Sequence, residues 1–199
     1  MKISIVIPTL NEEENLPVVM KDVKDFLRKK GYDYEILVVD GYSSDRTIEI
    51  AKKHGARILY DKYGKGSALV KGIGASKGDI IITMDADCSH KANEIGMLIE
   101  GISAGFDICM GSRFIQGGGT DDMPFLRKMG NRFFVYLVNS IWNMNYSDLC
   151  YGYRSFGKGA VKKMKLKSKG FGCLKCQATK SSAQTALEDC AHLRTGILF

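Results

Sequence analysis

The 199-residue sequence has no apolar run near the length of about 20 residues that a membrane-spanning helix needs. Its longest apolar stretch, residues 133–142, contains Asn139 and Ser140. The start of the chain also lacks the small-residue cleavage site of a secretory signal peptide. We therefore expect a cytoplasmic protein that is at most peripheral to the cytoplasmic face of a membrane.

Two signatures of nucleotide-binding proteins are absent as well. The chain shows no internal repeat, and no G-x-G-x-x-G dinucleotide fingerprint follows its first predicted strand. A nucleotidyltransferase would carry a glycine- and arginine-rich phosphate loop at that place, where this chain has the sequence Pro-Thr-Leu-Asn-Glu at 8–12. The missing loop argues against a nucleotidyltransferase. Such an enzyme would be the alternative for a fold in which strands and helices alternate and acidic residues follow the strands.

The composition is that of a globular domain with an excess of positive charge. Hydrophobic residues make up 45% of the chain and charged residues 26%, and the net charge is +7. Part of the excess is local, because residues 158–169 hold six lysines and no acid. No aromatic residue is interleaved with these lysines, which argues against nucleic acid as a partner. The run predicts either a solvated helix face or a peripheral contact with an anionic membrane surface.

The six cysteines of the chain fall into two groups. Three of the six cysteines stand singly, as is typical of reduced core residues in a cytoplasmic protein; they are Cys88, Cys109 and Cys150. The others cluster near the C-terminus with a histidine: Cys173, Cys176, Cys190 and His192. A C-x-x-C pair also occurs in zinc sites, but the second regular pair is missing, so zinc binding stays an open alternative.

Apolar residues recur along the chain with two different periods. Short apolar runs predict strands at 2–7, 34–39, 57–60, 80–84 and 106–110. Amphipathic or apolar segments predict helices at 12–30, from the loop 40–45 to about 53, at 67–75, at 92–104 and at 125–142. We expect Pro8 to end the first strand, and the first helix to carry acids in its first turn and bases in its last. The alternation predicts an α/β fold with a mainly parallel sheet and helices on both faces.

Two carboxylates, Asp85 and Asp87, come directly after the apolar run 80–84. Like charges this close raise each other's pKa unless a cation or hydrogen-bond donors compensate, so the pair indicates a bound divalent metal ion. The alternative is that both acids cap the next helix or lie solvated in a turn. In parallel sheets, ligands bind outside the carboxyl ends of the strands. Because residues 8–12, Asp40 and Arg113 fall at the same predicted edge, a binding site is favoured over the capping alternative.

Several motifs occur in order along the chain and together resemble one family. They lie at residues 8–12, 38–40 with 43–47, 64–68, 78–79, 85–87 with His90, and 111–113. The set resembles the family 2 nucleotide-sugar glycosyltransferases of GT-A fold, and within them the dolichyl-phosphate mannosyltransferase-like branch. Asp148 and residues 152–154 are similar to the downstream part of that pattern. The resemblance implies a Rossmann-like sandwich in a nucleotide-sugar-binding domain at 1–170, followed by a divergent or disordered tail at 171–199.

The resemblance also implies roles for individual residues. The nucleotide-sugar-binding residues would be Pro8, Leu10, Glu12, Val39, Asp40, Lys65, Asp85, Ala86, Asp87 and Arg113. Asp85 and Asp87 would bind Mg²⁺ or Mn²⁺, since hard carboxylate oxygens suit hard cations. The acceptor's phosphate would meet Arg127, Arg132 or Arg154, because guanidinium groups suit phosphate. The catalytic residues would be Asp87, Arg113 and Asp148.

The implied reaction moves a hexose, mannose or glucose, from GDP-mannose or UDP-glucose to a polyprenyl (dolichyl) phosphate, with inversion. A phosphate acceptor arrives ionised and needs no strong base, so positioning and electrostatics would carry catalysis. A saccharide hydroxyl, the alternative acceptor, would require a carboxylate base such as Asp148.

The chain departs from the family pattern in two regions. Many relatives have a second acid where Gly41 stands and a glycine at Tyr42, and some carry a glutamine at Ser89, so base or sugar preference is open. After residue 171 the family would continue with an acid-bearing helix and a strand, which this sequence does not match. We interpret this end as truncated or frame-shifted, with a genuine divergent tail as the alternative. An inactive nucleotide-sugar-binding remnant therefore remains a third possibility for the function.

Overall fold

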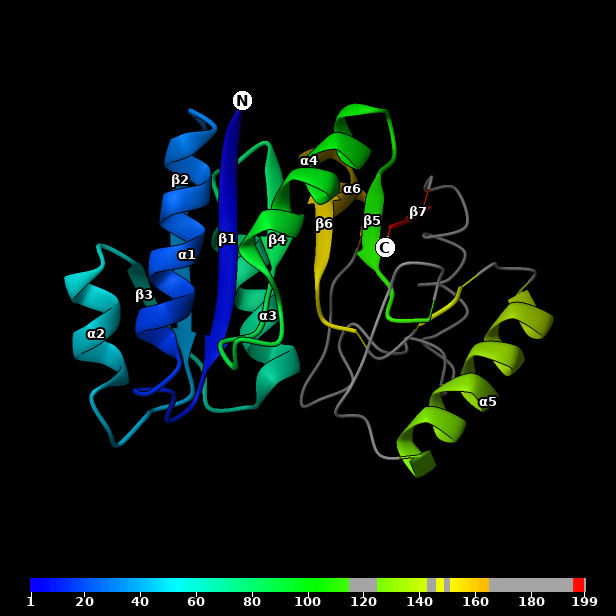
Figure 1. Ribbon diagram of the computed structural model, residues 1–199, viewed down its shortest axis with the longest axis horizontal. Coiled ribbons are helices and arrows are strands. Elements are labelled where there is room, and N and C mark those ends of the chain that lie inside the picture. The colour runs from blue at the N-terminus through cyan, green and yellow to red at the C-terminus, as the bar shows by residue number, and fades with distance from the viewer. Residues whose placement is uncertain (115–124, 143–145, 149–150, 165–194, 199) are drawn as a thin grey trace.

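The computed structural model describes residues 1–114, 125–142, 146–148, 151–164 and 195–198. In this part of the chain, seven strands form one sheet in the order β3-β2-β1-β4-β6-β5-β7 (Figure 1). The strands are β1 (Lys2–Thr9), β2 (Asp33–Asp40), β3 (Arg57–Tyr60), β4 (Ile80–Thr83), β5 (Ile108–Gly111), β6 (Arg154–Gly157) and β7 (Thr195–Leu198). Only β6 runs antiparallel to its neighbours, β4 and β5. The prediction of a mainly parallel sheet is therefore confirmed.

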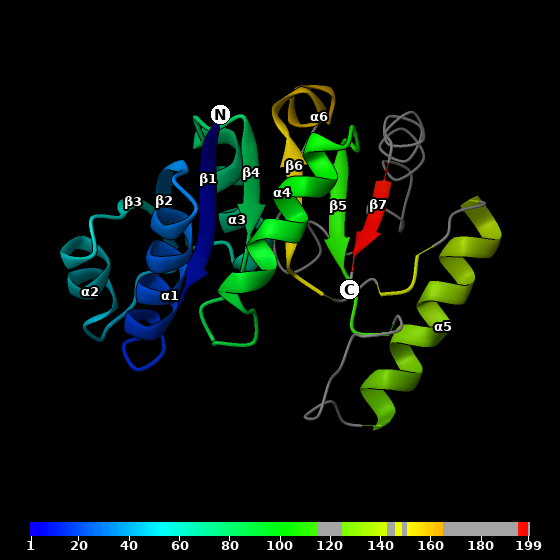
Figure 2. The same ribbon diagram turned by 45° about the horizontal axis from the view of Figure 1, so that its top comes forward.

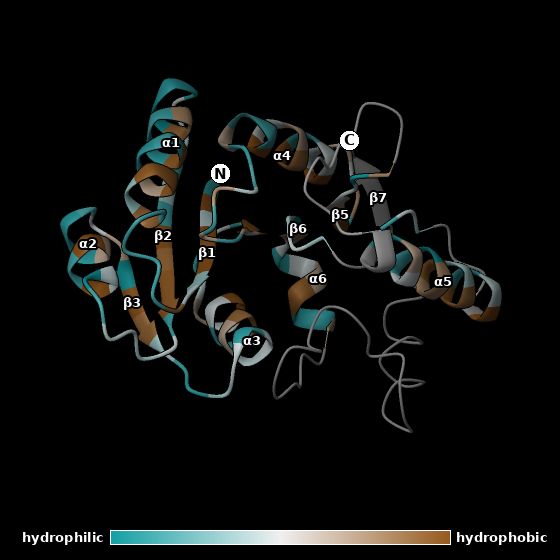
Figure 3. Cartoon of the chain, turned by 60° about the horizontal axis from the view of Figure 1, so that its bottom comes forward, coloured by the Kyte–Doolittle hydropathy of each residue, from teal (hydrophilic) through white to brown (hydrophobic). Residues whose placement is uncertain are grey.

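Helices cover both faces of the sheet, as predicted (Figures 1 and 3). One face carries α1 (Leu16–Lys29), α2 (Thr47–Lys53), the 3₁₀ turn η1 (Ala92–Glu94) and α4 (Ile95–Ser103). The other face carries α3 (Lys65–Ala75) and α6 (Lys158–Lys163). The result is a three-layer α/β/α sandwich in which β1 and β4 lie near the middle.

The central strand β1 is buried on both faces because its side chains alternate between the two helical layers. Ile5 and Ile7 pack into the cluster that includes α1 and α4, whereas Val6 packs into the cluster that includes α3. All three side chains have no exposed surface. This packing fixes β1 firmly, so the loop that follows it starts from a rigid position.

Pro8 does not end the first strand, which is a correction to the sequence analysis. β1 continues to Thr9, and Pro8 lies opposite Val39 on β2. The Val6 carbonyl accepts a hydrogen bond from the N–H of Met84, just past the end of β4. In a strand, every second residue directs its backbone groups to the same neighbouring strand, so the backbone nitrogen of Pro8 also faces the side of β4. Because β4 ends at Thr83, the missing N–H of proline costs no bond with that strand.

The first helix begins at Leu16 rather than at residue 12 and has no acid in its first turn, so that part of the prediction is wrong. The preceding backbone is bound elsewhere, since the N–H of Glu12 donates to Oγ1 of Thr47 at 2.8 Å. The proline at position 17 suits the first turn, where a backbone N–H has no helical partner. The predicted basic last turn is confirmed by Arg28 and Lys29.

Helix α5 (Phe125–Trp142) has the predicted bounds and stands beside the sandwich (Figures 1 and 2). Two asparagines tie it to the segment 146–148. Asn139 exchanges two hydrogen bonds of 2.8 Å with the backbone of Tyr146, and Asn131 donates to Asp148. Among the described helices, α5 included, none combines the length and apolar character required to cross a bilayer.

Candidate functional site

A cleft of about 310 Å³ opens at the carboxyl ends of the central strands. It contains seven of the predicted donor-site residues, namely Pro8, Leu10, Glu12, Lys65, Asp85, Ala86 and Asp87. The remaining lining residues are Thr9, Gly41, Asp61, Lys62, Gly64 and Ala68. The first loop, the end of β2, the start of α3 and the loop after β4 therefore meet at one place, as the rule for parallel sheets predicts.

Asp85 is held at two of its atoms. Its Oδ2 lies 2.6 Å from Nζ of Lys65, which comes from the first turn of α3. Its backbone N–H donates to Nδ1 of His90 at 2.9 Å. The side chain is 19% exposed and that of Lys65 38%, so both charges remain accessible from the cleft.

His90 is a buried, uncharged support for Asp85. It is 5% exposed and stacks on Tyr153, with a 4.6 Å centroid separation, while Tyr151 meets it edge-on at 4.8 Å. Burial lowers the pKa of His90 from 6.5 to about 4, although Asp85 and Asp87 act in the opposite direction. Because Nδ1 accepts the hydrogen bond from Asp85, the neutral ring carries its proton on Nε2.

Asp87 is ionised at neutral pH. Burial opposes the charge, but hydrogen bonds from Ser89 and the nearby His90 and Lys65 outweigh it and lower the pKa of the Asp87 carboxyl. The N–H of Ser89 donates to Oδ1 at 3.0 Å. Cys88, which we expected in the core, is exposed, because it occupies a left-handed turn with a φ of 61° between these two residues.

Val39 and Asp40 lie beneath the cleft and are fully buried. Both carboxylate oxygens of Asp40 are used internally. Oδ1 accepts hydrogen bonds from the hydroxyls of Thr9 and Ser43, at 3.2 and 2.5 Å, and Oδ2 accepts one from the Ser43 N–H at 2.8 Å. Asp40 thus ties the end of β1 to the loop after β2, and Thr9 and Gly41 of these segments line the cleft.

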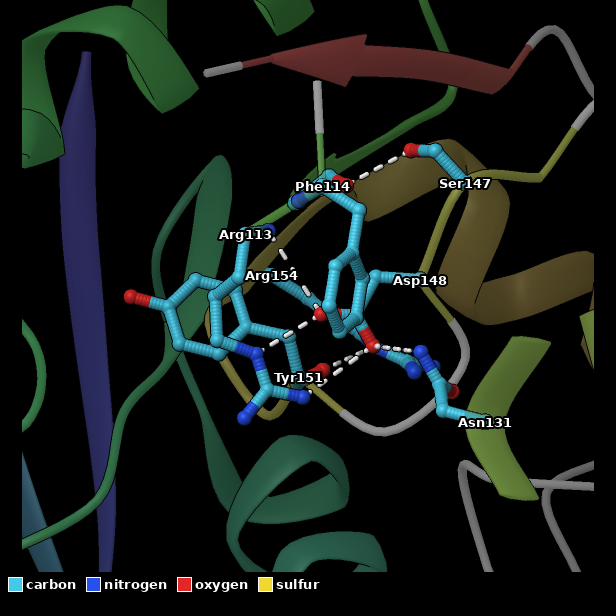
Figure 4. Close-up of polar contacts among 8 residues, drawn as sticks. Arg113, Phe114, Asn131, Ser147, Asp148, Tyr151 and Arg154 are labelled. Carbon is cyan, nitrogen blue, oxygen red and sulfur yellow. Dashed lines mark hydrogen bonds and ion pairs between the residues drawn. The ribbon is translucent and has the colours of Figure 1, made fainter. Parts of the chain in front are cut away.

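Arg113 and Asp148 form a buried bidentate pair (Figure 4). Nε and one terminal nitrogen of Arg113 donate to the two oxygens of Asp148, at 2.8 and 3.2 Å. The Arg113 backbone N–H and Asn131 of α5 also donate to this carboxylate, at 3.5 and 3.1 Å. The Arg113 guanidinium carbon also lies 5.0 Å from the centroid of the Tyr151 ring, within the range of a cation–π contact. With its side chain fully buried, Asp148 acts here as the anchor of Arg113.

The three arginines predicted to receive the acceptor phosphate have different environments. Arg132 is exposed on α5. Arg154 is 7% exposed at the start of β6, and its Nε donates to the Tyr151 carbonyl at 3.2 Å. Arg127 belongs to α5, but its side chain is outside the described part of the structure. Only Arg132 therefore presents an accessible guanidinium among the two that are described.

Asp85 and Asp87 are two carboxylates at this cleft that could hold a metal ion. Within the described residues, no group of three or more His, Cys, Asp or Glu side chains is arranged to hold a metal. This matches a hard divalent cation that takes one or two carboxylates and completes its shell with substrate phosphates and water, as Mg²⁺ does. The cysteine cluster that left zinc open, at 173, 176, 190 and 192, lies outside the described residues.

The site has two halves, the cleft that contains Asp85 and the pair of Arg113 and Asp148. Sequence reasoning missed the residues that connect these two halves. The Tyr151 ring contacts Arg113, and Gly152 packs against Asp85. Asn131 donates a hydrogen bond to Asp148. The two residues of each contact are distant in sequence. An asparagine at 131, just before the apolar run 133–138 of the same helix, was the available signal for one of them. The ring contacts of Tyr151 depend on packing that no local pattern encodes.

The fold is shared with solved glycosyltransferase structures. Glucosyl-3-phosphoglycerate synthase from Mycobacterium tuberculosis, solved with Mn²⁺, UDP and glucosyl-3-phosphoglycerate, superposes with a TM-score of 0.71 at 18% identity. The match covers 98% of this chain and 68% of that one. This likeness confirms the GT-A-type fold that the sequence motifs predicted.

Curated relatives are similar over more than half of this chain. A dolichol-phosphate mannosyltransferase from Pyrococcus furiosus is 40% identical over 135 residues, 65% of this chain and 38% of that protein. An undecaprenyl-phosphate 4-deoxy-4-formamido-L-arabinose transferase from Pectobacterium atrosepticum is 39% identical over 53% of this chain and 35% of that protein. The matched segments thus span little more than a third of these two relatives. The model of the family named Glycosyl transferase family 2 matches residues 4–165, so the chain belongs to glycosyl transferase family 2.

Proposed function

We propose that this protein transfers a hexose from a nucleotide-diphosphate sugar to a polyprenyl phosphate, with a divalent metal ion and inversion at the anomeric carbon. The observation that carries the proposal is the pair Asp85 and Asp87 at the floor of a cleft beside Lys65. Two carboxylates and one ammonium group in the same cleft suit a metal–diphosphate group. The carboxylates can bind the metal cation, and the ammonium can bind a phosphate oxygen.

The donor would lie along the cleft. Asp85 and Asp87 would hold Mg²⁺ or Mn²⁺, and Lys65 would meet a phosphate oxygen. When bound, the ion would act as a Lewis acid that offsets the charge growing on the leaving nucleoside diphosphate. The base and ribose would then lie toward the other lining residues, Leu10, Gly41 and Lys62. This arrangement suits GDP-mannose or UDP-glucose, and relatives of this chain include an enzyme named for mannose transfer.

The state of Asp148 favours a phosphate acceptor over a hydroxyl acceptor. A hydroxyl needs a general base within hydrogen-bond reach, and the candidate, Asp148, has no exposed side-chain surface and accepts at least four hydrogen bonds. A phosphate monoester arrives ionised, so its oxygen can attack without losing a proton to the protein. The names of two relatives, for dolichol phosphate and undecaprenyl phosphate, support the same acceptor class.

The acceptor chain would reach the site from a membrane surface. Lys158, Lys162 and Lys163 are exposed on α6, within the lysine run of 158–169. Each such lysine near an anionic surface contributes roughly 1 kcal/mol of attraction. We therefore propose a peripheral contact with the cytoplasmic face of a membrane, with Arg132 on α5 available to the acceptor's phosphate.

A product assay tests the proposal. The purified protein is incubated with Mn²⁺ and GDP-mannose or UDP-glucose, and with either a short-chain polyprenyl phosphate or an oligosaccharide. We expect a glycosylated lipid phosphate, whose formation the Asp87→Ala variant abolishes and Asp25→Ala, at an exposed site on α1, does not. Transfer to the oligosaccharide alone, or transfer that survives Asp87→Ala, would contradict the proposal. Binding of the donor without any transfer would indicate the inactive remnant instead.

A further inference from the structure

The segment 151–153 lies between the two halves of the site and is held from three sides. Oγ1 of Thr83, at the end of β4, donates to the Gly152 carbonyl at 3.0 Å. The N–H of Gly111, at the end of β5, donates to the Tyr153 carbonyl at 3.0 Å. The Tyr153 hydroxyl donates to the Lys91 carbonyl, also at 3.0 Å. The segment is therefore fixed to the same strand ends that present Asp85 and Arg113.

Gly152 packs directly against the carboxylate of Asp85. A Cβ atom at this glycine would lie 3.3 Å from both Oδ1 and Oδ2 of Asp85. Gly152 is not among the residues with positive φ, so its backbone conformation is open to alanine. Glycine thus leaves space beside the carboxylate, and a methyl group here would require Asp85 to move by a few tenths of an ångström.

The two tyrosines that flank Gly152 connect the same segment to His90 and Arg113. Tyr153 stacks on His90 with an interplanar angle of 7°, and Tyr151 meets His90 edge-on. Tyr151 also lies under the guanidinium of Arg113. Both tyrosine rings therefore pack against His90, which accepts a hydrogen bond from the Asp85 backbone. The Tyr151 ring also supports the guanidinium of Arg113.

We propose that residues 151–153 are the positioning element of the site, which sets the Asp85 carboxylate and the Arg113 guanidinium in a fixed relation to each other. The inference rests on the proposed function, since it assigns these two groups to the donor's metal–diphosphate. A purely structural role, leading the chain from residue 148 into β6, would not require empty space at Gly152 or a ring under Arg113.

The decisive variant is Gly152→Ala, with Gly159→Ala on α6 as its matched control. Position 159 has nothing within 4 Å of an added Cβ. In the metal-free protein, ¹⁵N NMR should show displaced amide signals for Asp85 and His90 in Gly152→Ala and unchanged ones in Gly159→Ala. Unchanged signals in both variants would overturn the inference, whether or not the parent binds a nucleotide.

Calorimetric titration of GDP or UDP in the presence of Mn²⁺ then links the position of Asp85 to binding. Changes that misplace a metal ligand typically cost about 10- to 100-fold in metal affinity, so we expect Gly152→Ala to lose about tenfold or more. Gly152→Ala that binds like the parent would overturn the inference. A parent that binds neither nucleotide would instead overturn the proposed function, and the NMR comparison would still decide the positioning role.

Two further variants distinguish an effect of the Tyr151 ring on catalysis from an effect on the stability of the fold. Tyr151→Leu removes the aromatic surface from both His90 and Arg113, whereas Tyr151→Phe keeps it. We expect Tyr151→Leu to lower kcat at least several-fold more than Tyr151→Phe, with similar melting temperatures for the two variants. Equal kcat values for the two variants would contradict the bracing of Arg113.

Discussion

The ammonium of Lys65 lies 2.6 Å from Oδ2 of Asp85, so a carboxylate assigned to a metal ion is paired with a cation of the protein itself. A metal that binds Asp85 therefore competes with Lys65, and the released ammonium becomes available to the phosphates. Lys65 would thus weaken the binding of metal alone and strengthen the binding of metal with diphosphate.

The Lys65→Met variant should separate these two effects. Exposed ion pairs contribute roughly 0.2–1 kcal/mol, so we expect Mn²⁺ alone to bind up to about fivefold more tightly, as measured by electron paramagnetic resonance. Mn²⁺ with GDP or UDP should bind more weakly than in the parent, because a phosphate partner is lost. Lys71→Met, on the outer face of the same helix, serves as the control. Weaker binding of Mn²⁺ alone in Lys65→Met would contradict the competition.

The pH dependence of stability should report the buried His90. The pKa of His90 is lowered by burial from 6.5 to about 4, so the unfolded chain takes up a proton before the folded protein does. Stability therefore falls as the pH drops below about 6.5 and levels off below about 4. From about pH 7 to about pH 5.5 we expect a loss of about 1 kcal/mol from this group, measured by urea unfolding of the metal-free protein.

His90→Gln should abolish most of this pH-dependent loss, whereas His54→Gln should retain it. Burial and the nearby Lys24 and Lys53 also lower the pKa of His54, but this ring is only partly buried, whereas His90 is 5% exposed. An unchanged slope in His90→Gln would show that His90 is not the buried neutral group described here.

Asp148→Asn tests the anchor of Arg113. The substitution leaves a largely buried guanidinium without its carboxylate, and removing one partner of a buried pair costs about 3 kcal/mol. We expect this loss in the free energy of unfolding by urea, against less than about 0.5 kcal/mol for the exposed Asp25→Asn. A loss below about 1 kcal/mol for Asp148→Asn would indicate that the pair is solvated.

The close packing of α3 on the sheet can be tested at two glycines of that helix. A Cβ at Gly72 would overlap Cγ1 of Val6, whereas one at Gly74 would meet nothing within 4 Å. Gly72→Ala should therefore destabilise the protein by about 1–3 kcal/mol, and Gly74→Ala should stabilise it by up to about 1 kcal/mol. Thermal unfolding of the two variants should show shifts in opposite directions. Equal shifts would mean that α3 can move away from β1.

The alternation of strands and helices up to β5 was predictable because each element carries its own local period. The buried run before Asp85 and the apolar stripe of α1 both pointed to the observed elements. Errors occurred where tertiary contacts decide the outcome. Pro8 stays in β1 because β4 has already ended, and residues 12–15 stay outside α1 because their backbone binds the loop 45–47.

The donor half of the site followed from the topology of a parallel sheet, while the connections between its halves did not. Insertion of β6 between β4 and β5 brings Gly152 to Asp85, and such a long-range pairing leaves no local pattern. Asp40 and Asp148 are likewise buried, and each is bound by a residue distant in sequence, Thr9 and Asn131 respectively. The boundary predicted at residue 170 stays a prediction, although Thr195–Leu198 adds β7 beside β5.

The most direct test of the proposed site is the metal dependence of nucleoside diphosphate binding. Calorimetric titration of GDP and UDP into the protein, with and without Mn²⁺, would be compared for the parent, Asp85→Asn, Asp87→Asn and the control Asp25→Asn. We predict Mn²⁺-dependent binding that falls by about tenfold or more in the first two variants and is retained in Asp25→Asn. Equally tight nucleotide binding without Mn²⁺, or binding unaffected by Asp87→Asn, would contradict the assignment of this cleft to a metal–diphosphate group.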